Sequence, residues 1–391
     1  MALVFLSSPS RACAQVWTQT SAPTTNWTRV ACSADGSKVV APVFVEVWTG
    51  SGYDVFPGPI YISTNSGASW AATSAPITNW NSVCMSADGN TIFAEVNGGP
   101  IYLSTNSGAY WSATSAPIDY RTAMACSSDG VKVSSTQYYL PGMVYLSTNS
   151  GISWTNNYVG SGLMSVACSA DGNTMVVGAY WVAGASVLVS TDGGWTWTAP
   201  VPADGLNWNG VACSADAHEM AAASPNYAVY ISTNSGLSWI PAAVPNEVWS
   251  CTTSSADGRK LAVAATTFQG SLGAIYSSSD SGMNWVSNSA PNLWWQSIAS
   301  SADGETMFAI GGNNIYVRRT TPRPMLNVTP SGNNILLSWI VPSQLFTLQQ
   351  SSDLATWSAV GVSPALNYSN VHYEVVISVT GNKQFFRLVS Q

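Results

Sequence analysis

Charged side chains are scarce in this sequence. Asp, Glu, Lys and Arg make up 8% of its 391 residues, whereas an ordinary globular chain contains about 25%. Only 12 of them are Lys or Arg, and the formal net charge is -7. A chain so poor in cations is unsuited to the phosphates of a nucleic acid or to an anionic membrane. We expect neither among its partners.

Histidine is nearly absent as well. The two present, His218 and His372, fall in a predicted turn and near the C-terminus, so we expect neither a His-based catalytic triad nor a His-rich metal site. No motif implies a cofactor. Long apolar runs are also missing, because beyond the N-terminus no stretch of about 20 apolar residues predicts a membrane-spanning helix.

Residues 1–14 are predicted to be the remnant of a signal peptide. Residues 2–6 (ALVFL) are a short apolar run, and Ala12-Cys13-Ala14 matches an A-x-A cleavage site, although the basic residues that usually precede the run are missing. We therefore expect export, to the medium, the periplasm or the cell surface. The alternative is an apolar tail with no role in targeting.

Two short patterns recur along most of the chain. One is Ser-Ala-Asp-Gly or a close relative, and the other is Ser-Thr-Asn-Ser-Gly-x-x-Trp with small variations. The tryptophans of the second pattern are spaced by about 41 to 46 residues, the length of one four-stranded blade of a β-propeller. The first pattern begins at Ser33, Ser86, Ser127, Ser169, Ser214, Ser255 and Ser301. The second begins at Ser63, Ser104, Ser147, Ser190, Ser232 and Ser278.

The second pattern has the chemistry of a tight hairpin turn. Its Asn or Asp can bond to the backbone of the turn, its Gly accepts a positive φ, and its Trp can fill the space between layers. The pattern resembles the Asp-box, or BNR repeat, of bacterial sialidases, sortilin-type receptors and the photosystem II assembly factor family. The resemblance covers roughly residues 15–320. Asn replaces the family's usual Asp in four of the six copies, and either residue can make the turn.

The seventh copy of the second pattern is missing. Residues 314–317 (NIYV) match the strand before a turn, but no Trp follows, whereas residues 16–23 (VWTQTSAP) match 69–76 (SWAATSAP) near the start of the chain. We therefore predict an all-β fold: a seven-bladed propeller of four-stranded blades over residues 15–320. Its N-terminal strand joins the last blade and closes the ring, which removes exposed sheet edges.

The repeats stop at a short linker. Residues 321–325 contain two prolines that stiffen it. Residues 326–391 contain short strand-like runs between turn residues and predict a small β-sandwich, similar to the fibronectin-like tails of secreted bacterial proteins.

The cysteines do not read as a disulfide framework. Cys32, Cys126, Cys168 and Cys213 each directly precede the same motif residue, so they occupy one structural position in four repeats. We expect small apolar side chains inside a tight inner strand. Disulfide bonds are the alternative.

One recurring position predicts a ligand-binding face. The residue six places before each Ser-Ala-Asp-Gly motif begins an inner strand, which the resemblance places near the mouth of the central channel. Aromatic rings there would suit stacking on sugars. The alternative is that they pack between blades as core. The position holds Trp27, Trp80, Arg121, Leu163, Trp208, Trp249 and Trp295, and loops predicted on the same face add Trp48, Tyr53, Tyr138, Tyr139 and Trp181.

Catalysis has less support in the sequence. Sialidases need an arginine cluster, and only Arg121 falls at the predicted mouth. A glycoside hydrolase with paired carboxylates would need two acids about 5 to 10 Å apart, and the candidates are Asp54, Asp119, Asp204 and Glu247. The hypothesis we adopt is an exported, monomeric, non-catalytic propeller that binds a glycan or a protein partner. The alternatives are a glycoside hydrolase of the Asp-box type and an assembly scaffold.

Overall fold

The structure is a computed structural model that describes most of the chain. The described residues are 16–48, 53–139, 141–160, 162–179, 187–199, 206–226, 228–266, 273–320, 324–378 and 384–390. Every regular element within these ranges is a β-strand, so the predicted all-β class is confirmed. No helix of the described residues is long and apolar enough to cross a membrane. The predicted signal peptide lies outside the described residues.

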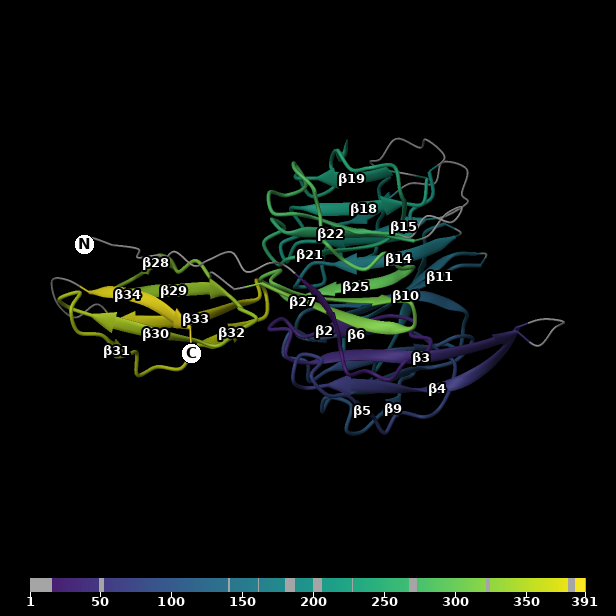
Figure 1. The fold of residues 1–391 in the computed structure, drawn as a ribbon, viewed down its shortest axis with the longest axis horizontal. Coiled ribbons are helices and arrows are strands. Elements are labelled where there is room, and N and C mark those ends of the chain that lie inside the picture. The colour runs from purple at the N-terminus through teal and green to yellow at the C-terminus, as the bar shows by residue number, and fades with distance from the viewer. Residues whose placement is uncertain are drawn as a thin grey trace.

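Seven antiparallel sheets follow one another along the chain (Figure 1). The strands of each sheet are arranged in chain order, except that the first strand of the described chain joins the last sheet. We number these sheets 1 to 7. Sheet 1 contains β2 (Ala31–Cys32), β3 (Val39–Trp48), β4 (Tyr53–Ser63) and β5 (Ala71–Ala72), and sheet 2 contains β6 (Trp80–Met85), β7 (Ile92–Val96), β8 (Ile101–Ser104) and β9 (Ser112–Ala113). Sheet 3 contains β10 (Arg121–Cys126), β11 (Val133–Gln137), β12 (Met143–Ser147) and β13 (Thr155–Tyr158). Sheet 4 contains β14 (Leu163–Cys168), β15 (Met175–Ala179) and β16 (Val187–Ser190). Sheet 5 contains β17 (Gly210–Cys213), β18 (Met220–Ser224), β19 (Ala228–Ser232) and β20 (Ile240–Pro241). Sheet 6 contains β21 (Val248–Ser254), β22 (Leu261–Thr266), β23 (Ile275–Ser278) and β24 (Val286–Ser287). Sheet 7 contains β25 (Trp295–Ser300), β26 (Thr306–Gly311), β27 (Asn314–Arg319) and β1 (Trp17–Gln19).

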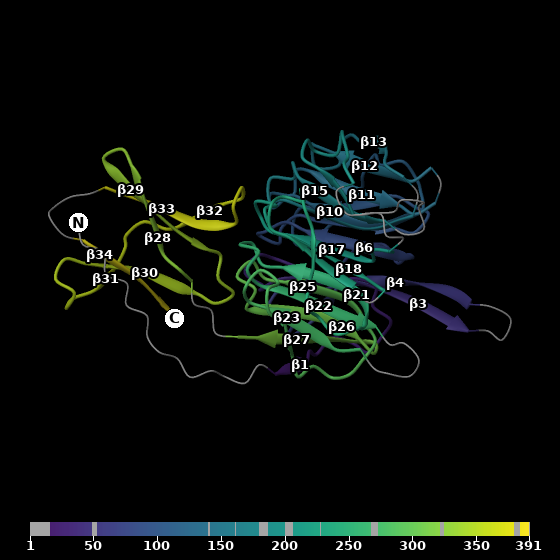
Figure 2. The same ribbon diagram turned by 90° about the horizontal axis from the view of Figure 1, so that it is seen from above.

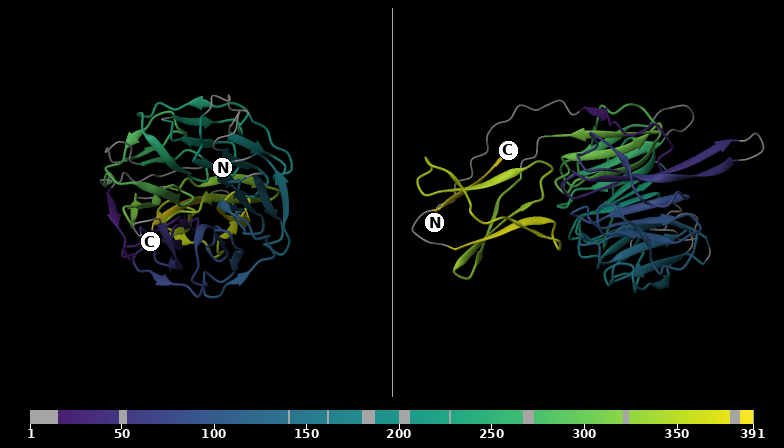
Figure 3. Two further views of the ribbon diagram at one scale, coloured as in Figure 1. Left: turned by 90° about the vertical axis from the view of Figure 1, so that its right-hand side faces the viewer. Right: turned by 90° about the horizontal axis from the view of Figure 1, so that it is seen from below.

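The sheets stand around a common axis (Figure 3, left). The inner strands β2, β6, β10, β14, β17, β21 and β25 each contact the next, and β25 contacts β2 again. β1 pairs antiparallel with β27, so that Trp17 lies opposite Arg318. The first strand of the described chain is thus the outer strand of sheet 7.

A cycle of backbone hydrogen bonds joins the Ser-Ala-Asp-Gly turns at one end of the axis. The N–H of the second residue of each motif donates to the carbonyl oxygen of its counterpart in the next sheet, at 2.7 to 2.8 Å, and the last motif donates to the first. Within each motif the Asp accepts from the Ser hydroxyl and from the backbone two residues on, as in Ser33 and Asp35. The cycle runs through Ala34, Ala87, Ser128, Ala170, Ala215, Ala256 and Ala302.

The turns of the second pattern are built by their side chains, as their sequence predicts. In sheet 1 the Ser63 hydroxyl donates to Asn65 Oδ1 at 3.0 Å and accepts the Gly67 N–H at 2.8 Å. Ser66 and Gly67 both have positive φ, and a Cβ on Gly67 would stand 2.9 Å from Thr20. Only Gly fits this second place without a shift in the neighbouring sheet.

The six described cysteines carry free thiols. Burial raises the pKa of Cys32 and of Cys213 to about 12. Thiols so reluctant to ionise are poor nucleophiles and poor metal ligands, which agrees with the expected packing role.

The C-terminal residues form two small sheets around their own core. Sheet β28–β29–β33–β32 faces sheet β31–β30–β34 across a core that includes Leu337, Trp339 and Phe386. The strands are β28 (Asn327–Ser331), β29 (Asn334–Ile340), β30 (Phe346–Ser351), β31 (Ser358–Ala359), β32 (Ala365–Asn367), β33 (His372–Ser378) and β34 (Phe385–Ser390). We call this unit the C-terminal domain.

The C-terminal domain covers the end of the axis where the Ser-Ala-Asp-Gly turns lie (Figure 2). Val341 and Val371 pack against the motif alanines, including Ala34. The Ser343 N–H donates to Asp303 Oδ2 at 2.7 Å, and the Tyr368 hydroxyl donates to Asp88 Oδ2 at 3.2 Å. This end of the axis is therefore occupied, and a ligand has to approach from the other end.

Candidate functional site

The five tryptophans expected at the channel mouth are buried. Trp80, Trp249 and Trp295 are 0% exposed, Trp208 is 1% exposed and Trp27 is 2% exposed. The prediction that they offer a ring of aromatic faces to a ligand is therefore wrong. They pack as core, which is the alternative that the sequence left open.

A tyrosine of the third strand explains where these tryptophans go. Each indole meets the tyrosine of its own sheet edge to face, with ring centroids 5.4 to 5.8 Å apart, a favoured geometry for aromatic pairs. The pairs are Trp27 with Tyr61, Trp80 with Tyr102, Trp208 with Tyr230, Trp249 with Tyr276, and Trp295 with Tyr316. The recurrent Trp is thus half of a packing unit.

The residue after each of these positions points the other way, because successive side chains of a strand alternate between its faces. Asn81, Thr122, Met164 and Asn209 occupy that place in sheets 2 to 5, and all four line a cavity of about 550 Å³. The Asn81 amide and the Thr122 hydroxyl each donate to the backbone oxygen of the next sheet, at 2.7 Å. Of the residues predicted on the ligand face, Arg121, Tyr138 and Tyr139 line the cavity, whereas the five tryptophans do not.

The cavity lies at the end of the inner strands away from the C-terminal domain. Its lining holds hydrogen-bonding side chains and three tyrosines, with no Asp or Glu among the described lining residues. Tyr120 and Tyr139 are 59% and 61% exposed, and their rings meet edge to face at 6.1 Å. The lining residues are Arg29, Asn81, Asn97, Tyr120, Arg121, Thr122, Tyr138, Tyr139, Met164 and Asn209.

Asn209 and Arg29 of the lining have unused hydrogen-bonding capacity, and the buried Nε of Arg121 also lacks a partner among the described residues. Asn209 Oδ1 is buried and has no partner among the described residues, which is costly unless a water or a ligand fills the need. The guanidinium of Arg29 donates to the Gln296 oxygen at 3.5 Å, the far limit of a hydrogen bond. Both groups are free to bond to a ligand in the cavity.

Arg121 replaces the recurrent Trp in sheet 3. Its guanidinium lies 5.0 Å from the ring centroid of Tyr145, the tyrosine that a Trp would meet, and it donates to the backbone oxygens of Gly99 (2.8 Å) and Pro117. The side chain is 2% exposed, and this burial lowers the pKa of Arg121 while Glu95 opposes the shift. Arg121 thus reaches the wall of the cavity with its charge held by the protein.

Glu95 lies beneath the cavity and departs from the repeat. It is 0% exposed, its Oε2 accepts from Ser135 at 2.8 Å, and its Oε1 lies 3.4 Å from the Asn81 amide. Burial raises the pKa of Glu95 to about 7, against the hydrogen bond from Ser135 and the charge of Arg121. The same position of the second strand holds Pro42, Thr136, Gly178, Ala223, Ala264 and Ile310 in the other sheets.

Asp119 acts as a hydrogen-bond acceptor inside the same group of residues. It accepts from Gln137 Nε2 at 2.9 Å and from the Tyr145 hydroxyl. Burial, followed by the bond to Asp119, raises the pKa of Tyr145 to about 12. Asp119 itself does not line the cavity, so it supports the wall near Arg121.

The remaining candidates are not brought to this site. Glu247 is half-buried just before β21 and does not line the cavity. Trp48 and Tyr53 pair with each other across the ends of β3 and β4, and Asp54 follows in β4, while their side chains lie outside the described residues. Asp204 and Trp181 also lie outside them. Sequence reasoning missed Arg29, Asn81, Glu95, Asn97, Tyr120, Thr122, Met164 and Asn209.

Comparison with known proteins identifies the fold. No family model matches the chain and no curated protein matches its sequence. Solved structures do resemble it: a GH74 xyloglucanase from Xanthomonas campestris (TM-score 0.59, 13% identity, 83% of this chain), YCF48 bound to D1 peptide (0.57, 14%, 80%) and the WD40 repeats of RRP9 (0.62, 11%, 80%). The likeness spans 59%, 99% and 100% of those chains, respectively. The chain is therefore similar to β-propeller proteins, and identities this low concern the fold alone.

Proposed function

We propose that the protein is a closed seven-bladed propeller of the Asp-box type that binds a glycan in its central cavity without catalysis. The seven sheets, the pairing of β1 with β27 and the cycle of hydrogen bonds through Ala34 and Ala302 support the closed ring. The proposal includes export as a monomer, for which residues 1–14 are the signal remnant.

The lining of the cavity carries the proposal. Sugar hydroxyl groups both donate and accept, and the amides of Asn97 and Asn209 offer both functions, whereas Asn81 has its amide nitrogen engaged and offers its oxygen. Exposed tyrosine rings at the rim suit the apolar face of a sugar. A volume of about 550 Å³ falls in the usual range for small-ligand sites, about 300 to 1,000 Å³.

The chemistry of the lining favours binding over hydrolysis. A glycoside hydrolase needs two carboxyl groups that flank the sugar bond, and none of the described lining residues carries one. Glu95 is fully buried and Asp119 is engaged by Gln137 and Tyr145. Hydrolysis remains the second candidate because one of the similar structures is a xyloglucanase.

A peptide is the other candidate ligand, since a similar propeller was solved with a bound peptide. A glycan array tests the choice. We expect the protein to bind at least one glycan, and Tyr120→Ala and Asn209→Ala each to weaken that binding about tenfold, as loss of one stacking or hydrogen-bonding contact does. Trp294→Ala is the matched control, because Trp294 is 58% exposed and does not line the cavity. Absence of glycan binding, or equal binding by all variants, contradicts the proposal.

A further inference from the structure

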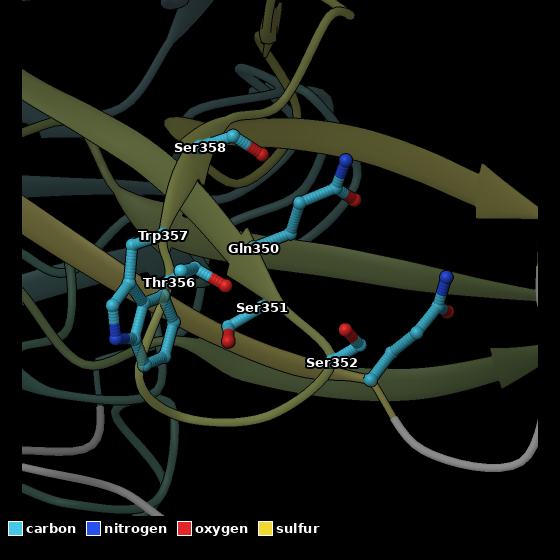
Figure 4. A pocket seen from close by; sticks show the side chains of 7 residues that line it. Gln350, Ser351, Ser352, Thr356, Trp357 and Ser358 are labelled. Carbon is cyan, nitrogen blue, oxygen red and sulfur yellow. The ribbon is translucent and has the colours of Figure 1, made fainter.

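The C-terminal domain has a second cavity, of about 340 Å³, at one end of sheet β31–β30–β34 (Figure 4). Gln350 of β30 and Ser358 of β31 lie opposite each other in the strand pairing, and both line the cavity with Trp357. Gln384, just before β34, completes the wall on the other side of β30. The lining shares no residue with the cavity of the propeller.

The turn that presents Trp357 is fixed by its own hydrogen bonds. The Ser351 hydroxyl donates to Asp353 Oδ1 at 2.9 Å, the Thr356 N–H donates to the same oxygen at 2.8 Å, and Trp357 Nε1 donates to the Leu354 oxygen at 3.2 Å. Hydrogen bonds from the Thr356 and Ala355 backbone, followed by those from the Thr356 and Ser351 hydroxyls, hold the pKa of Asp353 well below its usual range. The arrangement repeats that of the propeller turns, and it keeps this wall of the cavity rigid without a ligand.

The other polar side chains of the lining are not used by the protein. Among the described residues, the side chains of Gln350, Ser352 and Ser358 make no hydrogen bond, and Gln384 Oε1 is buried without a partner. A buried acceptor left unpaired costs free energy. Four amide or hydroxyl groups thus stand around one cavity with their donors and acceptors available.

None of the described lining residues carries a charged side chain. Arg387 has its guanidinium 4.1 Å from the Trp357 ring centroid and donates through Nε to Gln349 Oε1 at 2.9 Å, so the protein itself already holds this cation. Amides and hydroxyls that both donate and accept match sugar hydroxyls, and an indole ring suits the apolar face of a sugar. We propose that this cavity is a second binding site, specific for a neutral sugar residue.

The test uses the full chain with the propeller site disabled by Tyr120→Ala and Asn209→Ala. We expect this protein to retain binding to at least one glycan on an array of neutral oligosaccharides, and addition of Trp357→Ala or Gln384→Ala to weaken that binding about tenfold. Ser363→Ala is the matched control, because Ser363 is exposed in the same domain and does not line the cavity.

Three results overturn the second site. The first is that the propeller-disabled protein binds no neutral glycan. The second is that neither Trp357→Ala nor Gln384→Ala changes the binding, and the third is that Ser363→Ala loses as much binding as they do. Trp357→Phe keeps an aromatic ring and separates loss of stacking from loss of folding, since we expect it to retain binding within about threefold. The separate array with an intact propeller site and Trp357→Ala shows whether the propeller cavity binds by itself, so the two proposals fail independently.

Discussion

Trp17 and Arg318 lie directly opposite each other in the pairing of β1 with β27, although they come from the two ends of the seven-sheet array. Trp17 is 5% exposed, and its ring centroid lies 6.0 Å from that of Trp295 in the same sheet. The first strand therefore contributes both backbone pairing and a buried aromatic ring to sheet 7.

Removal of this strand is predicted to destabilise the whole array. We expect Trp17→Ala alone to lower the free energy of unfolding by about 3 to 5 kcal/mol, as truncation of a buried aromatic residue does, and deletion of residues 15–22 to cost more. Thermal melting followed by circular dichroism measures both. Deletion of residues 1–14 is the control and should leave the melting temperature unchanged. A 15–22 deletion that melts like the parent contradicts closure by β1.

The stability of the protein is predicted to fall with rising pH because of Glu95. Its pKa is about 7 in the folded protein against 4.5 for the free side chain, so the folded state holds this proton more tightly. The resulting contribution is complete below pH 4.5 and is lost as the pH rises through 7. It is on the order of 3 kcal/mol.

Urea unfolding at several pH values measures this dependence. We expect Glu95→Gln to flatten the profile of the free energy of unfolding between pH 5 and pH 8, because the amide cannot ionise. A variant that keeps the slope of the parent would show that another group causes it.

Asn and Asp are predicted to be interchangeable in the turns of the second pattern. Asn234 Oδ1 accepts from the Ser232 hydroxyl and from the Ser238 N–H, both at 3.0 Å. Asp280 accepts the equivalent bonds in sheet 6, at 2.7 and 2.9 Å. We expect Asn234→Asp to change the free energy of unfolding by less than about 0.5 kcal/mol and Asn234→Ala to lower it by about 2 kcal/mol. Equal losses in the two variants would refute a turn held by that oxygen.

The contact between the C-terminal domain and the motif alanines is predicted to stabilise both parts. Val341 is 2% exposed and packs against Ala34, Ala170 and Ala302. A carboxylate at this place would be buried without a partner, so we expect Val341→Glu to cost at least about 3 kcal/mol. Val362→Glu is the matched control, because Val362 is 54% exposed in the same domain. Similar melting of the two variants argues against the contact.

The repeated elements were predictable from the sequence because their cause is local. The turn around Asn65 follows from a side chain that bonds to its own backbone and a Gly that accepts positive φ. The all-β class and the propeller fold followed from the spacing of such turns. The sequence match between residues 16–23 and 69–76 likewise showed that the N-terminal segment is the outer strand that the last repeat lacks, and this predicted the pairing of Trp17 with sheet 7.

The site was not predictable to the same degree because it depends on which face of a strand each side chain takes. Trp80 and Asn81 are neighbours in sequence, yet the first packs on Tyr102 and the second lines the cavity. The sequence prediction chose the Trp as the ligand-binding residue, because aromatic rings suit stacking on sugars. The signal that was available is the break in the repeat at Glu95 and Arg121, because both are charged and the equivalent residues of the other sheets are not.

The docking of the C-terminal domain on the alanine ring left no pattern in the sequence. Val341 and Val371 are ordinary apolar residues of a small β-domain, and only the folded arrangement brings them to Ala34 and its counterparts. The turn around Asp353 was detectable, because Ser351, Asp353 and Trp357 are spaced almost as in the propeller turns. The turn in the C-terminal domain has one residue fewer between its Ser and its Trp than the propeller turns have, and this difference concealed the similarity.

A crystal structure of the protein with the strongest glycan from the array tests glycan binding in the propeller most directly. We predict electron density for the sugar in the propeller cavity, with the rings of Tyr120 and Tyr139 on one side of it and the amide of Asn209 on the other. A ligand hydroxyl should donate to the unpaired Asn209 Oδ1. Density on another surface of the propeller, with this cavity holding water alone, would contradict the account.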